Sequence, residues 1–150
     1  MQLAKGPSDE LFRLFANLGQ ALQHPAADKP VLNQLTFTIL GALGRHPHRV
    51  TELTEVTGLD QSTVSRRVAS LCDAGLAERL PDPDDGRAQQ ICPSGAGLEL
   101  VAKERARRVR TVTDALSDWT DADCADLTRL LAQLNASMEA RRGIVREGDQ

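Results

Sequence analysis

The stretch from Leu53 to Leu76 constrains the fold most, because it compresses two short helical patterns and a glycine turn into one segment. Thr51 just before it is a suitable N-cap, and Leu53 and Val56 fall on one face of a helix. Gly58 then stands where a left-handed residue can end that helix. The pattern predicts a short helix with a defined end.

A second helical pattern follows at once. Asp60 offers its N-cap, and an apolar face recurs at helical spacing through Val64, Val68 and Leu71. The rest of the cylinder is polar and carries Gln61, Ser62, Thr63, Ser65, Arg66 and Arg67. Gly75 closes the helix where a glycine C-cap is expected. Two helices joined by a glycine-containing turn form a helix-turn-helix unit, whose second helix can enter a DNA major groove.

The preceding chain predicts two more helices. Leucine and phenylalanine at helical spacing indicate a helix over residues 8–23, with Ser8 as its N-cap. The segment HPAADKP, residues 24–30, contains two prolines and indicates a linker. A second amphipathic helix runs from about Leu32 and stops near Arg45.

A small hairpin is expected after the helix-turn-helix unit. The runs 76–80 and 88–92 are short and partly apolar, and the segment PDPDDGR between them is a strong turn signal. They predict a two-stranded hairpin with a charged tip, the element called a wing when it follows a helix-turn-helix.

Two longer helices close the chain. Ser94 can cap a helix that runs to about Ser117, and Thr120 and Asp123 resemble a capping box before a last helix through Met138. Residues 141–150 are polar and are expected to fray. These helices carry more apolar surface than a small winged domain can bury, so we expect them to pack with the first helix and with a second copy of the chain. A two-fold dimer would place two recognition helices about 34 Å apart.

Length and composition favour one domain over residues 1–150, since 150 residues with 41% hydrophobic content can form one sizeable core. We expect a mainly α fold with a small β-hairpin wing: a winged helix-turn-helix region over 31–93 and a helical dimerisation region over 8–23 and 94–140. The N-terminus lacks a signal peptide and no stretch is apolar enough to span a bilayer, which favours a cytoplasmic protein without membrane contact. An odd cysteine count, at Cys72, Cys92 and Cys124, favours reduced thiols.

Net charge and sequence motifs help to distinguish a DNA-binding protein from a protein-binding module and from an enzyme. The net charge is -3, and the segment from Val50 to Cys92 is locally acidic, so an alternative to DNA binding is a winged-helix module that binds another protein. The sequence shows no glycine-rich phosphate loop, nucleophile elbow or metal triad, which argues against an enzyme, a cofactor and a metal. His46 and His48 are expected to face solvent rather than bind a metal.

The order of the expected elements and the local amino-acid sequence resemble those of the MarR (multiple antibiotic resistance regulator) family of winged-helix transcription factors. The resemblance covers roughly Leu11 to Met138, and residues 51–97 are its most specific part. Asp85-Gly86-Arg87 is similar to the family's wing pattern of aspartate, any residue and arginine. Pro93-Ser94 departs from it, since the family commonly has Leu-Thr there.

This resemblance implies a homodimeric regulator, usually a repressor. Such a protein binds a short pseudo-palindrome in double-stranded DNA and often releases it when a small-molecule effector binds. The DNA contacts that it implies are Gln61, Ser62, Thr63, Ser65, Arg66 and Arg67 in the recognition helix and Arg87 in the wing, with Asp85 supporting the wing.

The chemistry of these residues fits such a role. A guanidinium can bond the two acceptors of guanine, which suits Arg66 and Arg67, and side chains in a helix's first turn, such as Ser62, can approach phosphates. Arg87 can enter a narrow minor groove, pair with a neighbouring aspartate of the wing, or do both, since an aspartate can brace the wing while the remaining donors of the arginine face DNA.

Five basic residues follow in the long helix: Lys103, Arg105, Arg107, Arg108 and Arg110. Glu99 and Glu104 lie four residues before Lys103 and Arg108, so we expect helix ion pairs on a solvated face. Arg105 falls on the apolar side, where it makes an ion pair within the dimer or lines a ligand cavity.

Overall fold

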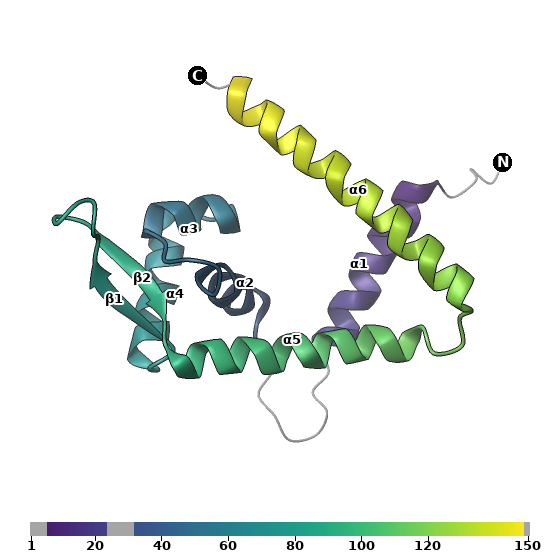
Figure 1. The fold of residues 1–150 in the computed structure, drawn as a ribbon, viewed down its shortest axis with the longest axis horizontal. Coiled ribbons are helices and arrows are strands. Elements are labelled where there is room, and N and C mark those ends of the chain that lie inside the picture. Colours follow the sequence, from purple (N-terminus) through teal and green to yellow (C-terminus); the bar gives the residue numbers. More distant parts are fainter. Residues whose placement is uncertain (1–5, 24–31, 149–150) are drawn as a thin grey trace. The chain divides into compact units, whose positions relative to one another are not determined.

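The computed structural model describes residues 6–23 and 32–148. Within them the elements run in the order α1 (Pro7–Gln23), α2 (Gln34–Leu43), α3 (Val50–Thr57), α4 (Gln61–Asp73), β1 (Ala77–Pro81), β2 (Gln89–Pro93), α5 (Gly95–Ala115) and α6 (Asp121–Gly148) (Figure 1). The expected fold class, mainly α with one β-hairpin, is confirmed. The linker expected at 24–30 lies outside the described residues.

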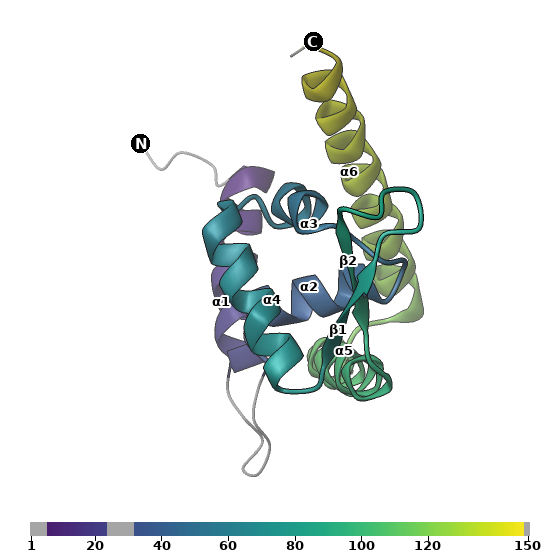
Figure 2. The ribbon, with the colours of Figure 1, turned by 90° about the vertical axis from the view of Figure 1, so that its left-hand side faces the viewer.

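The chain divides between Thr111 and Val112 into two compact units. In the first unit, α2, α3, α4 and the hairpin gather at the N-terminal end of α5 (Figures 1 and 2). Their shared core consists of aliphatic side chains that solvent does not reach, chiefly Ile39, Leu40, Leu43, Leu53, Val64, Val68 and Ile91. Every helix of the helix-turn-helix region and both wing strands, β1 through Ala77 and β2 through Ile91, contribute to it, so the core fixes α4 relative to the wing.

The turn between α3 and α4 has the expected construction. Gly58 ends α3 with φ 68°, and its N–H donates to the carbonyl of Thr54 at 2.8 Å. Asp60 caps α4 by accepting from the N–H of Thr63 at 2.9 Å. Both predictions are confirmed. The cap expected at Thr51 is wrong: α3 begins at Val50 and its N-cap is Arg49, because the carboxylate of Glu52 accepts from the Arg49 N–H at 2.7 Å.

The hairpin is antiparallel, with Ala77 opposite Pro93 and Pro81 opposite Gln89. Each strand begins and ends one residue later than the sequence pattern predicts. The pairing extends because the N–H of Asp82 donates to the carbonyl of Ala88 at 3.0 Å, which continues the ladder into the wing.

The start of α5 lies against the end of the helix-turn-helix region. Ser94 caps the helix as expected, accepting from the N–H of Gly97 at 3.0 Å, while its hydroxyl donates to the carbonyl of Gly75 at 2.6 Å. A Cβ on Gly97 would lie 2.0 Å from the carbonyl oxygen of Leu76. Only glycine therefore allows the helix to approach that carbonyl so closely.

The basic run of α5 differs from the prediction of a solvated face. Glu104 is only 6% exposed and accepts from Arg107 at 2.8 and 2.9 Å and from Arg108 at 2.8 Å. Arg107 also donates to the Leu22 carbonyl at the end of α1, and Arg108 to the Leu32 carbonyl before α2. The expected Glu104–Arg108 pair exists, but tertiary contacts with two other segments bury it. The Glu99–Lys103 pair is exposed, as predicted.

The second unit contains the end of α5 and all of α6. Thr120 accepts from the N–H of Asp123 at 3.2 Å and donates to its carboxylate at 2.6 Å, so the expected capping pair is present. Helix α6 continues to Gly148, seven residues beyond Arg141, where the polar end was expected to begin. None of the helices in the described ranges is long and apolar enough to cross a membrane.

We expect Gly97→Ala to destabilise the protein by about 2 kcal/mol or more, because the added methyl group would collide with backbone rather than with a flexible side chain. Thermal unfolding at fixed protein concentration measures the effect. Gly95→Ala is the matched control, since nothing lies within 4 Å of a Cβ there. It should be neutral or stabilising by up to about 1 kcal/mol. Equal melting temperatures for the two variants would contradict the proposed contact.

The burial of Glu104 between two arginines makes the stability of the protein depend on pH in a specific way. The guanidinium of Arg107, and then that of Arg108, hold the pKa of the Glu104 carboxyl below its ordinary value. A carboxyl whose pKa is lower in the folded state stabilises the protein above its unfolded-state pKa and loses this contribution as the pH falls through the folded-state pKa. Glu104→Gln should therefore lower stability at pH 7, by roughly 3 kcal/mol, and lose less on acidification than the parent protein.

Urea unfolding between pH 7 and pH 3 tests this, with the exposed Glu99→Gln as control. The control should change little at pH 7. A Glu104→Gln curve parallel to that of the parent at every pH would exclude the buried ion pair as the cause.

Candidate nucleic-acid interface

The polar face of α4 is available for contact. Its apolar residues Val64, Val68 and Leu71 are buried in the core, which turns the opposite face outward. The six polar residues that the sequence singled out are all exposed or half-buried: Gln61, Ser62, Thr63, Ser65, Arg66 and Arg67. The structure thus leaves all six accessible around the part of α4 that the core does not cover.

The first turn of α4 is organised by Asp60. Its Oδ1 accepts from the Ser62 hydroxyl at 2.5 Å, and its Oδ2 accepts from the Thr63 hydroxyl at 2.7 Å. The Ser62 hydroxyl above all, and then the Thr63 hydroxyl and N–H, hold the pKa of Asp60 well below its ordinary value. A fixed negative charge therefore lies at the start of α4. Sequence spacing indicated a helix cap here but did not show that both hydroxyl hydrogens are committed to it.

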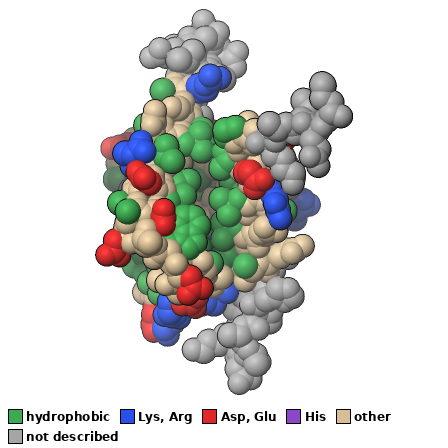
Figure 3. Space-filling view, turned by 90° about the vertical axis from the view of Figure 1, so that its right-hand side faces the viewer, with side chains coloured by type: hydrophobic (Ala, Val, Ile, Leu, Met, Phe, Trp, Pro, Cys, Tyr) green, Lys and Arg blue, Asp and Glu red, His purple; other side chains and the backbone are tan. Residues whose placement is uncertain are grey.

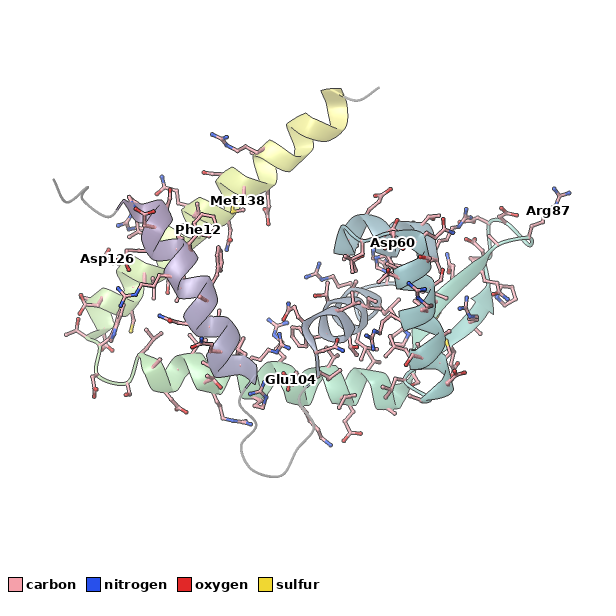
Figure 4. The ribbon with its side chains drawn as sticks, turned by 180° about the vertical axis from the view of Figure 1, so that it is seen from behind. Phe12, Asp60, Arg87, Glu104, Asp126 and Met138 are labelled. Atoms are coloured by element: carbon pink, nitrogen blue, oxygen red, sulfur yellow. The ribbon has the colours of Figure 1, made fainter. Side chains whose placement is uncertain are left out.

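Three arginines carry the available positive charge of this surface. The guanidiniums of Arg66 and Arg67 have no hydrogen-bond or ion-pair partner within residues 6–23 and 32–148. In the wing, Asp85 Oδ1 accepts from the backbone N–H of Arg87 at 3.0 Å, and the Arg87 guanidinium has no partner in the described chain. Figure 4 shows the Arg87 side chain extending outward from the hairpin tip. Asp85 thus braces the turn while leaving the guanidinium available.

The base of the wing is held by a contact that sequence reasoning missed. Arg49 Nε donates to Asp82 Oδ2 at 2.6 Å, and Asp82 Oδ1 accepts from the N–H of Asp84 at 2.8 Å. The Asp82 side chain is 1% exposed, and the hydrogen bond from Arg49 holds its pKa below the ordinary value. The two partners are 33 residues apart, so no local pattern could have paired them.

The histidines differ in part from expectation. His48 is only 6% exposed, so the prediction that it faces solvent is wrong. It is buried because its backbone pairs with Ile91 of β2, and its ring stacks on that of His46 with centroids 3.9 Å apart. In the described part of the chain no group of three or more His, Cys, Asp or Glu residues is arranged to hold a metal ion.

A cavity of about 700 Å³ lies between α2, α3 and α5 of the first unit. Its wall is mixed, with apolar side chains such as Phe37 and Val101 and the two cations Arg45 and Arg105. Arg105 has no ion-pair partner among the described residues, and its guanidinium can meet an anion in the cavity.

The sequence of this region matches a known family. Residues 32–88 match the model of the MarR family. The uncharacterized HTH-type transcriptional regulator YxaD of Bacillus subtilis is 33% identical over 89 residues, which cover 59% of this chain and 62% of YxaD. The chain therefore spans less than two thirds of the length of this relative.

Solved structures share the fold over a longer range. A MarR family protein from Bacillus stearothermophilus is 22% identical, with a TM-score of 0.79, over 88% of this chain and 92% of that protein. BpsR of Bordetella bronchiseptica is 19% identical, with a TM-score of 0.68, over 90% of this chain and 96% of that protein. Both likenesses extend well beyond residues 32–88 and show the same fold.

We expect Arg49→Met to loosen the wing, because the buried Asp82 carboxylate would lose its charged donor. Amide hydrogen exchange over residues 82–88 should become roughly three- to tenfold faster. Arg79→Met is the control, since Arg79 is exposed on β1 and has no side-chain partner in the described residues. Unchanged exchange in Arg49→Met would show that the wing does not depend on this contact.

Proposed function

We propose that this chain, whose residues 32–88 match the model of the MarR family, is a homodimeric, sequence-specific DNA-binding transcriptional regulator. The observation that carries the proposal is the pair of unpartnered guanidiniums on the outward face of α4, with a third on the wing tip. A helix anchored by its apolar face and donating from its polar face is suited to a DNA major groove.

The residues divide between base and backbone contacts. Arg66 and Arg67 can bond the O6 and N7 acceptors of guanine or reach phosphates. Gln61 and Ser65, four residues apart, share a neighbouring face of α4. Arg87 extends from the wing far enough to enter an adjacent minor groove, where a narrow A·T-rich segment attracts arginine. Because few cations face the DNA and the chain carries a net charge of -3, we expect modest phosphate affinity.

A second copy of the chain is the proposed partner. In the first unit α1 exposes Phe12 and Phe15, at 75% and 61%. In the second unit α6 exposes Leu130 and Met138, at 53% and 50%. Figure 3 shows hydrophobic side chains exposed at the surface of the molecule. Such surface favours burial against another chain, and we assign the dimerisation region to residues 8–23 and 94–140.

The cavity beside α2 is the proposed effector site. Its apolar side chains and its two arginines suit a small organic anion with an apolar part. The DNA binding of BpsR is regulated by 6-hydroxynicotinic acid, a molecule of this kind. Since α2 packs against α3, an occupant can displace the helix-turn-helix region, and we propose that the regulator is a repressor relieved in this way.

The competing proposal is a winged-helix module that binds another protein and no longer binds DNA. The ionised Asp60 at the start of α4 favours it, because a negative charge there repels phosphate. This module would show no DNA binding even at low salt.

Selection of bound duplexes from a random pool tests the proposal. We expect two related half-sites with centres about one helical turn, or 34 Å, apart. Arg66→Ala and Arg67→Ala should each weaken binding to the selected site by roughly 5- to 100-fold, and Arg87→Ala should reduce the preference for flanking A·T pairs.

Arg45→Ala is the charge-matched control, because Arg45 is exposed after the end of α2, outside α4, the wing and the proposed dimerisation region, and should leave affinity unchanged when no effector is present. No enrichment from the pool at low salt, together with identical behaviour of Arg66→Ala and the parent, would reject DNA binding in favour of the protein-interaction module.

A further inference from the structure

We propose that Asp60 is a specificity-determining residue: it holds the hydroxyl hydrogens of Ser62 and Thr63, so that these side chains accept hydrogen bonds from DNA but do not donate them. The inference rests on the proposed DNA-binding function and names the chemical groups that this surface reads. It also replaces the sequence-based expectation that these hydroxyls approach phosphates.

The hydrogen-bond geometry sets this direction. The two oxygens of Asp60 lie 2.5 Å from the Ser62 hydroxyl and 2.7 Å from the Thr63 hydroxyl. An ionised carboxylate only accepts, and a hydroxyl has a single hydrogen to donate. The lowered pKa of Asp60 keeps the carboxylate ionised at neutral pH. Each hydroxyl therefore presents only its remaining lone pairs to an outside partner.

The lone pairs of the Ser62 and Thr63 hydroxyls can accept hydrogen bonds only from donor groups of DNA. Phosphate oxygens, guanine O6 and N7, adenine N7 and thymine O4 are all acceptors, so none of them can pair with these hydroxyls. The donors in the major groove are the amino groups of adenine and cytosine. Wherever Ser62 or Thr63 reaches a base edge, the contacted strand should therefore carry adenine or cytosine.

The next turn of α4 has the opposite chemistry. Arg66 and Arg67 lie four residues after Ser62 and Thr63, so each hydroxyl shares a helix face with one guanidinium about 6 Å further along the axis. Guanidiniums only donate, which directs them to guanine or phosphate. The recognition surface is thus divided into an accepting first turn and a donating second turn.

Asp60 also acts through its charge. Figure 4 labels Asp60 at the start of α4, where the backbone N–H groups of a helix ordinarily favour an anion. Here the Asp60 carboxylate already accepts from the N–H of Thr63 at this helix end, and its charge repels an approaching phosphate. Its removal should increase affinity for DNA of any sequence.

Asp60→Asn is the informative variant. Asparagine caps helices as well as aspartate and is nearly isosteric with it, so α4 should remain folded. Its amide nitrogen donates instead of accepting, which releases at least one hydroxyl hydrogen toward DNA. Selection from a random pool at one salt concentration, for the parent, Asp60→Asn and Ser62→Ala, reads out the consequence. Ser70→Ala is the control, because Ser70 is exposed about two turns further along α4, is not among the proposed DNA contacts and has no bond to Asp60.

For the parent we expect adenine or cytosine to be favoured over guanine and thymine roughly 5- to 100-fold at one or two positions of each half-site. Asp60→Asn should reduce this preference to less than about threefold and bind unrelated duplex more tightly, with a steeper salt dependence. Ser62→Ala should lose the preference at one position and keep the guanine preference set by the arginines. Ser70→Ala should keep the adenine or cytosine preference.

The inference is overturned if Asp60→Asn keeps the parent preference at full strength. It is also overturned if Ser62→Ala weakens binding equally for all sequences and lowers the salt slope by about one, as the loss of a phosphate contact would. Failure of the proposed function looks different: neither the parent nor Asp60→Asn, both folded by circular dichroism, would bind any duplex at low salt.

Discussion

The burial of one face of α4 fixes how the polar side of this helix is presented to a partner. Val64, Val68 and Leu71 enter a core shared with α2, α3 and β2, so the helix has a single rotational setting about its axis. That setting turns the polar residues outward. A recognition helix needs this fixed rotation, because a hydrogen-bonding pattern on DNA can be read only by side chains held in register with it.

The carboxylates of Asp60 and Asp82 add to the order that the core imposes on α4 and the wing. Asp60 fixes the direction of the hydroxyl hydrogens at the start of α4, and Asp82 ties the wing to Arg49 at the start of α3. Both carboxyls have lowered pKa values because they accept hydrogen bonds in the folded state. The locally acidic composition, which at first counts against DNA binding, is thus partly accounted for by residues that organise the surface on which Arg66, Arg67 and Arg87 lie.

Much of the local architecture could be predicted from the sequence. The caps at Asp60 and Ser94, the turn at Gly58 and the hairpin around PDPDDGR depend on residues within a few positions of one another, and the structure has all four. Predictions failed where distant contacts decide. From the sequence, Glu104 is expected to be the acid of an exposed helix ion pair. Its partners Arg107 and Arg108 also donate to the Leu22 and Leu32 carbonyls, and these tertiary contacts bury the pair. His48 is buried for the same kind of reason, through its pairing with Ile91.

The type and order of the elements and the residues on each helix face follow from the amino-acid sequence, because helical period, capping and turn chemistry act over three or four positions. Which charges remain unpaired depends on the tertiary fold. It paired Arg49 with Asp82 and buried Glu104 between two arginines, and it left Arg66, Arg67 and Arg87 without partners in the described chain. Hydrogen-bond partners are assigned by proximity in space, and folding brings together groups whose separation along the chain carries no local signal.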